Sequence, residues 1–173
     1  MTSVLPPEVA EQALAQALDG FRAAVGTNHV LTSDEDIAEF RDPYWFSGWD
    51  DFEASAVVQP ESVEEIQAIV RIANEHRIPL WVSSQGRNNG YGGSSPRVRG
   101  SVVVSLRRMN RVLEVNGDAA YAVVEPGVTN LTLDLEAAHH PGGEHETGHD
   151  GAQQQRRDHE EPARLDVRPD EEQ

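Results

Sequence analysis

The segment SAVVQPESVEEIQAIVRIANEHRIPLWV, residues 55–82, decides the fold class of this chain. Its first six residues are rich in β-branched side chains, and residues 78–82 are again apolar, so each run is typical of a short strand. Between them, Ser62 and Glu65 form a capping box that begins a helix. Apolar side chains then recur at helical spacing, at Val63, Ile66, Ile69, Val70 and Ala73. The order strand, helix, strand predicts a βαβ unit whose two strands are parallel neighbours in one sheet.

Periodic patterns continue on both sides of this unit. Towards the N-terminus, four apolar residues predict one face of a helix that ends at Gly26: Leu14, Leu18, Phe21 and Val25. Residues 41–51 are aromatic and irregular, and we interpret them as a loop. Three strand-like runs follow the unit, at residues 101–106, 111–116 and 120–128. The pattern predicts an α+β fold in which the βαβ unit joins a small mixed sheet.

The composition excludes several classes of function. The chain has 173 residues and a net charge of −16, with 14 basic against 30 acidic residues, which argues against nucleic-acid binding. Lysine is absent from the sequence, which excludes a Schiff-base mechanism and a P-loop nucleotide site. Cysteine is absent as well, which excludes disulfides, thiol catalysis and Cys-ligated metals. Since no apolar run is long enough to span a membrane, we expect a soluble cytoplasmic protein.

A glycine-rich loop, SSQGRNNGYGGSSP at residues 83–96, leaves the carboxyl end of the second strand, where ligands commonly bind in open α/β sheets. It leads to another strand instead of a helix, and its glycines do not match G-x-G-x-x-G, so this is not a Rossmann or Walker loop. Gly and Asn adopt positive φ at little cost and leave backbone N–H groups uncovered. The loop therefore favours an anion-binding nest for a diphosphate, with Arg87 as a supplementary charge. A plain connection between strands is the alternative.

Several motifs together resemble a known family. The loop contains S-x-G-R-N-x-G-Y-G-G, and P-R-V-x-G-S-V-V, M-N-R-V-L-E-V-N and E-P-G-V follow it in that order. This succession, over about residues 54–128, is similar to the FAD-binding domain of the vanillyl-alcohol oxidase and 4-cresol methylhydroxylase family. The resemblance implies the first subdomain of a PCMH-type FAD-binding domain within residues 54–138. Residues 1–53, which precede this domain, would then form the N-terminal helix followed by the aromatic loop.

The resemblance also implies which residues bind the cofactor, FAD. The loop around the FAD pyrophosphate corresponds to Ser84, Gln85, Gly86, Arg87, Asn88, Asn89, Gly92 and Gly93. A second cofactor-contacting turn corresponds to Pro126, Gly127 and Val128. The backbone argument from the glycines and this resemblance agree on a diphosphate ligand.

Members of this family oxidise para-substituted phenols by hydride transfer from the benzylic carbon to the flavin. Their catalytic residues lie beyond the matching segment, so no catalytic residue is assigned here. We expect a truncated FAD-binding segment that is inactive alone, with a phenolic substrate only in a full-length form. The alternative is a non-catalytic module that binds a nucleotide or only retains the fold.

Residues 139–173 depart from the family pattern. They are polar and without periodicity, so we expect a disordered tail, as from a shifted reading frame or a shortened gene. Within it, His145, Glu146 and His149 satisfy the zinc-protease motif H-E-x-x-H. The motif requires a helix, which Gly148 and the preceding Pro141 disfavour, and we predict no metal site.

Overall fold

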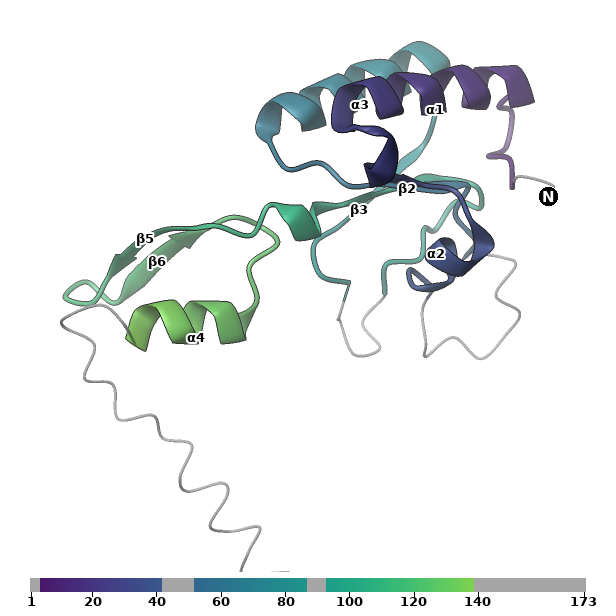
Figure 1. The fold of residues 1–173 in the computed structure, drawn as a ribbon. Helices are drawn as coiled ribbons and strands as arrows, with labels where there is room; N and C mark the ends of the chain where they lie inside the picture. Colours follow the sequence, from purple (N-terminus) through teal and green to yellow (C-terminus); the bar gives the residue numbers. More distant parts are fainter. Residues whose placement is uncertain (1–3, 42–51, 87–92, 139–173) are drawn as a thin grey trace, which may run out of the picture.

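The computed structural model describes residues 4–41, 52–86 and 93–138. Figure 1 shows helices on both sides of a sheet, with a separate arm extending to one side. In chain order the elements are α1 (Glu11–Val25), η1 (Thr27–His29), β1 (Val30–Leu31), α2 (Asp34–Ala38), β2 (Ala56–Val58), α3 (Val63–His76), β3 (Leu80–Ser83), β4 (Val102–Ser105), η3 (Leu106–Arg108), β5 (Val112–Asn116), β6 (Tyr121–Val124) and α4 (Asn130–Ala138).

The main sheet has the strand order β1-β2-β4-β3. β4 pairs in parallel with both β2 and β3, whereas β1 pairs antiparallel with β2. The predicted parallel direction of β2 and β3 is therefore confirmed, but the prediction that they are neighbours is wrong. β4 lies between them because its residues are buried on both faces, as a central position requires, whereas Val82 of β3 is 61% exposed and suits an edge.

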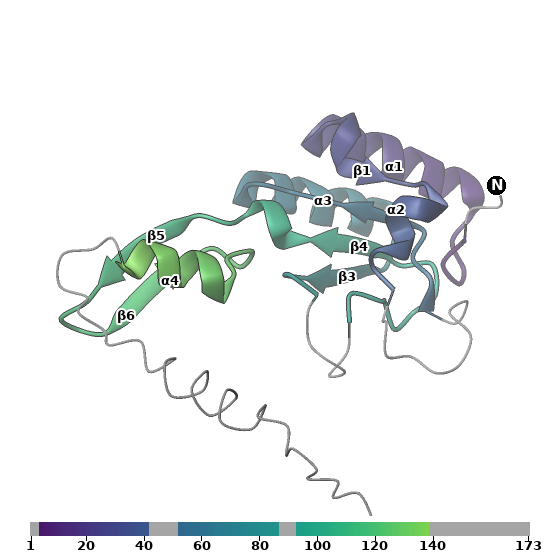
Figure 2. The ribbon, with the colours of Figure 1, turned by 60° about the horizontal axis from the view of Figure 1, so that its bottom comes forward.

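Alternate residues of the central strands face two different cores. Ala56, Val58, Val102 and Val104 pack with α1 and α3 in the larger cluster, which also contains Phe21. Val57 and Val103 point the other way, into a smaller cluster with Ile37 and Phe40. Figure 2 shows the same arrangement from another direction, with α1 and α3 on one side of the sheet and α2 on the other. The predicted N-terminal helix is confirmed as α1.

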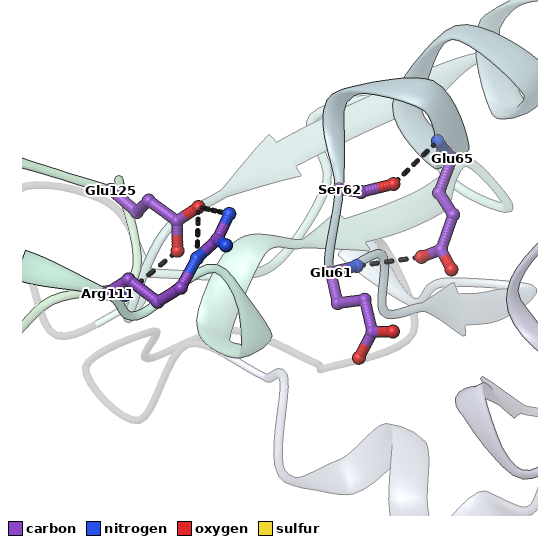
Figure 3. A network of polar contacts seen from close by, with 5 residues as sticks. All are labelled: Glu61, Ser62, Glu65, Arg111 and Glu125. Atoms are coloured by element: carbon purple, nitrogen blue, oxygen red, sulfur yellow. Dashed lines mark hydrogen bonds and ion pairs between the residues drawn. The ribbon is translucent and has the colours of Figure 1, made fainter. Parts of the chain in front are cut away.

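The start of α3 matches the predicted capping box with one difference (Figure 3). Ser62 Oγ accepts a hydrogen bond from the backbone N–H of Glu65 at 3.2 Å. The Glu65 carboxylate, however, accepts from the N–H of Glu61 at 2.8 Å, one residue before the cap. The first contact satisfies an N–H group that the first helical turn would otherwise leave without a partner, and the second fixes the residue before the cap against the helix.

The predicted apolar face of α3 is only partly correct. Ile69 and Ala73 are buried and Ile66 is partly buried, but Val63 and Val70 are 55% and 43% exposed. At about 100° per residue, these two valines lie on the flank of the face that packs against the sheet and α1. Ile72, which the prediction omitted, packs against the core instead.

The C-terminal arm consists of the antiparallel hairpin β5–β6 and α4, and it extends away from the main sheet in both ribbon views (Figures 1 and 2). Of the three strands predicted after the βαβ unit, the run at residues 101–106 joins the main sheet as β4, whereas the runs at 111–116 and 120–128 form a two-stranded sheet of their own, and the last of these ends as a strand at Val124. The small mixed sheet is thus built from β1 to β4. Large apolar side chains of the arm are exposed, among them Leu113, Val123, Leu131 and Leu135.

Several predictions lie outside the described residues. These are most of the aromatic loop, the predicted tail at residues 139–173, and the H-E-x-x-H motif within that tail. In the part of the chain that the structure describes, no helix is both long and apolar enough to cross a membrane.

Candidate functional site

The two ends of the glycine-rich loop meet at its base. Ser83, the last residue of β3, and Ser94 place their hydroxyl oxygens 3.1 Å apart. Gly86 adopts φ +68°, a conformation that side chains with a Cβ disfavour. A Cβ at this position would lie 1.8 Å from Ser94 Oγ, and Ser94 itself is buried. Gly86 is therefore required both by its backbone conformation and by the closeness of Ser94.

Gln85 joins this loop to the second predicted cofactor-contacting turn. Its side-chain Nε2 donates a hydrogen bond to the backbone carbonyl of Gly127, 42 residues further along the chain. The structure thus brings together the two segments that the sequence assigned separately to the cofactor. Since the side-chain Nε2 of Gln85 is engaged with Gly127, this side chain connects the two segments within the protein.

Gly127 packs closely against η3. Its N–H donates to the carbonyl of Met109 at 2.7 Å. A Cβ on Gly127 would lie 2.3 Å from the carbonyl oxygen of Leu106 and 2.7 Å from that of Met109. Because these obstacles are backbone atoms, a side chain at this position would push the turn away from η3. The glycine of this turn therefore permits a close backbone contact that holds the turn next to Gln85.

An ion pair between Arg111 and Glu125 fixes the base of the arm (Figure 3). Glu125 is 8% exposed, and its Oε1 accepts from Nε and Nη2 of Arg111 at 3.0 and 2.6 Å. Its Oε2 accepts from the backbone N–H of Arg111 at 2.9 Å. These hydrogen bonds lower the pKa of the Glu125 carboxyl below its ordinary value of 4.5, and the hydrogen bond to Glu125 raises the pKa of Arg111. The pair holds the start of the turn that contains Gly127.

Replacing Glu125 with glutamine should make the protein less stable at neutral pH. A carboxyl group whose pKa is lowered by folding contributes stability above its unfolded pKa, and this contribution disappears as the pH falls through the folded value. The difference in unfolding temperature between the wild type and Glu125→Gln should therefore shrink as the pH is lowered below about 4.5. Thermal unfolding followed by circular dichroism at several pH values measures this difference.

Glu61→Gln is the matched control for that prediction. Glu61 forms an ion pair with Arg108, but its side chain is 59% exposed. Exposed pairs contribute little to stability, so this variant should unfold close to the wild type at each pH. A pH-independent difference between the wild type and Glu125→Gln would contradict the role given to the Glu125 carboxylate.

The described part of the predicted site comprises seven residues. Ser84 and Pro126 are exposed, Gln85, Gly86, Gly93 and Val128 are partly buried, and Gly127 is buried. Arg87, Asn88, Asn89 and Gly92 lie outside the described residues. Arg107 was not among the predicted site residues, although its Nη2 donates to the carbonyl of Gln85 at 3.3 Å. An arginine two residues after the buried strand β4 was the available signal, but the sequence does not indicate which segment it contacts.

Comparison with known proteins identifies the family. Residues 54–150 match the family model described as FAD binding domain. The chain belongs to this FAD-binding family. FAD is accordingly the cofactor, and the PCMH-type fold expected from the motifs is confirmed.

The relatives support this assignment over most of the chain. The 4-cresol dehydrogenase [hydroxylating] flavoprotein subunit of Pseudomonas putida is 37% identical over 127 residues, which cover 73% of this chain and 24% of the relative. The 1'-carboxy-chondrochloren decarboxylase of Chondromyces crocatus is 43% identical over 70% of this chain and 22% of its own length. The structure of 4-ethylphenol oxidase from Gulosibacter chungangensis matches with a TM-score of 0.75 and 45% identity, over 78% of this chain and 26% of that chain. The chain thus spans about a quarter of the length of the curated relatives it matches.

The donor groups at this site fit the diphosphate of FAD. Ser84 is exposed directly after β3, and Gly86 has the positive φ that lets neighbouring N–H groups converge on an anion. Both lie at the carboxyl end of a parallel strand, where ligands of open α/β sheets bind. The backbone N–H groups of residues 84, 86 and 93 would hold the diphosphate, with the turn at residues 126–128 beside them, whereas the N–H of Gln85 donates to Ser84 Oγ.

Proposed function

We propose that this chain provides the diphosphate-binding part of a flavin oxidoreductase that acts on para-substituted phenols. Support for the substrate class comes from two relatives whose names specify 4-cresol and 4-ethylphenol, at 37% and 45% identity. FAD, when bound, accepts the hydride that leaves the benzylic carbon of such a substrate. The residues of this chain bind and orient the cofactor, and we assign none of them to the reacting carbon.

The contact between Gln85 and Gly127 is the observation that carries this proposal. It places two glycine-containing segments side by side at the carboxyl end of β3, and backbone N–H groups offer a diphosphate several donors without requiring a basic side chain. A loop that only connected β3 with β4 would not need a hydrogen bond to a turn 42 residues away. Both segments need a glycine, for different reasons. Gly86 has a positive φ, whereas Gly127 lies against the carbonyl oxygen of Leu106.

Binding of adenosine diphosphate tests the proposal directly. Amide NMR spectra of residues 1–173 should show shifts of the Ser84, Gly86 and Gly93 signals when ADP is added at millimolar concentration. Adenosine, which lacks phosphate, should leave these signals in place. If ADP and FAD both left them unchanged, the loop would be a plain connection and the proposed site would be wrong.

Turnover is a second measurement on the same protein. With FAD and 4-hydroxybenzyl alcohol, residues 1–173 should form no aldehyde above the free-flavin background. Oxidation of this alcohol removes a hydride and a proton, and the rate depends on holding the benzylic carbon against the flavin, which accounts for about 7–11 kcal/mol in favourable cases. Aldehyde above background would mean that these residues also position the substrate, which would contradict the restricted role proposed here. ADP binding without turnover supports that role.

A further inference from the structure

Arg107 contacts two segments that are far apart in the sequence. One guanidinium nitrogen, Nη2, donates to the backbone carbonyl of Gln85 at 3.3 Å. The other, Nη1, forms an ion pair with the Glu39 carboxylate. The guanidinium carbon lies 4.8 Å from the centroid of the Phe40 ring, within the range of a cation–π interaction. One side chain thus connects η3, the segment after α2, and the glycine-rich loop.

We propose that Arg107 is a positioning residue that orients the peptide bond between Gln85 and Gly86 for diphosphate binding. This inference rests on the proposed function of the loop. A trans peptide is planar, and its carbonyl and its N–H point in opposite directions. Because Arg107 holds the Gln85 carbonyl towards η3, the N–H of Gly86 points away from η3.

The contacts of Arg107 distinguish this role from direct phosphate binding. A guanidinium beside a predicted anion site is a natural phosphate ligand, because arginine pairs with phosphate through two parallel N–H groups. Here one nitrogen binds Gln85, the other binds Glu39, and the face of the group lies against Phe40. These contacts occupy one N–H of each terminal nitrogen and fix the plane of the guanidinium against Phe40, so the observed orientation serves contacts within the protein. Its positive charge is therefore used within the protein.

The geometry requires arginine and not only a positive charge. A lysine would carry the same charge, but its single ammonium group lacks the planar fork that reaches two acceptors in different directions and stacks on a ring. Arg107→Lys is therefore the informative variant. A residue that acts by its charge should tolerate lysine, whereas a residue that acts by its shape should not.

The neighbouring Arg108 offers a matched control. It belongs to the same short helix, but its Nη1 donates to the carbonyl of Gln59 at 2.6 Å and its Nη2 pairs with Glu61. Arg108→Gln removes one positive charge from η3, as Arg107→Gln does, without removing a contact to the glycine-rich loop. A general effect of charge or of η3 stability would appear in both variants.

The test measures the Gly86 amide signal without ligand and the ADP affinity of residues 1–173. In Arg107→Lys and Arg107→Gln we expect the Gly86 signal to move and the affinity for ADP to fall about tenfold, which corresponds to about 1.4 kcal/mol. Arg108→Gln should change neither quantity. Glu39→Gln keeps Arg107 and changes an exposed side chain, and it should move the same Gly86 signal by a smaller amount. This variant tests the positioning role even if the Arg107 variants fail to fold.

Two results would overturn the positioning role. Wild-type ADP affinity and an unchanged Gly86 signal in Arg107→Lys would show that only the charge matters. Equal changes in Arg107→Gln and Arg108→Gln would show a general effect of η3. The Gly86 signal without ligand also separates this inference from the proposed function. If the wild type failed to bind ADP, the proposed diphosphate site would be wrong. The Gly86 signal would still report whether Arg107 orients the peptide bond.

Discussion

Replacing Gly86 with valine should weaken ADP binding by residues 1–173 about a hundredfold, which corresponds to about 2.8 kcal/mol. A β-branched residue at φ +68° costs on the order of 1–3 kcal/mol in backbone strain alone. In addition, the new Cβ would lie 1.8 Å from Ser94 Oγ, and Ser94, at 3% exposure, has little room to move. The loop must therefore change shape, which would displace the N–H groups that we propose hold the diphosphate. Titration with ADP followed by NMR or calorimetry measures the loss.

Gly26→Val is the matched control for this prediction. Gly26 also has a positive φ, of 88°, but its Cβ would meet nothing nearer than His29 at 3.7 Å. It lies at the end of α1, away from the glycine-rich loop. This variant should lose some stability through backbone strain and keep wild-type affinity for ADP. Equal losses of ADP affinity in both variants would show that strain anywhere in the fold, and not the loop, controls binding.

Phe21→Ala should have the largest effect on stability, with a loss of about 3–5 kcal/mol in the free energy of unfolding. Phe21 is fully buried in α1 and belongs to the cluster that joins α1, α3 and the sheet. Its removal leaves a cavity among side chains held by two helices and a sheet, which cannot collapse freely. A loss of this size is a large fraction of the 5–15 kcal/mol that is typical of native domains. Urea unfolding followed by circular dichroism measures it.

Val63→Ala provides the comparison. Val63 is also an apolar residue of a helix in this layer, but it is 55% exposed. Its truncation should change the free energy of unfolding by less than about 0.5 kcal/mol. If Val63→Ala cost as much as Phe21→Ala, the assignment of Val63 to the flank of α3 would be wrong.

Local sequence patterns determined the two long helices and the β-branched strands. The apolar spacing in α1 and α3, the serine cap of α3 and the β-branched runs of β2 and β4 each reflect interactions between residues close in sequence. The glycine-rich loop could also be predicted from local sequence, because the positive φ of Gly86 is a property of one residue. β1 and α2, with 2 and 5 residues, are too short to produce a recognisable period.

The order of the strands was decided only by the tertiary structure. Two apolar runs flanking a helix indicate parallel strands, but nothing local indicates that a third strand will lie between them. That position depends on which strand can be buried on both faces, and this is a comparison among β2, β3 and β4. The exposed positions of Val63 and Val70 likewise depend on how α3 is rotated against α1 and the sheet.

The candidate site shows the same division between sequence and structure. The sequence alone identified both glycine-containing segments, through one-residue properties and motif order. Only the fold decided that Gln85 reaches Gly127, that Gly127 packs on the carbonyl oxygens of η3, and that Arg107 holds the Gln85 carbonyl. These contacts join residues far apart in the chain, and their geometry is set by the packing of β3, β4 and η3. The sequence predicted which backbone groups bind an anion, and the tertiary structure decided how the two segments that carry them are held together.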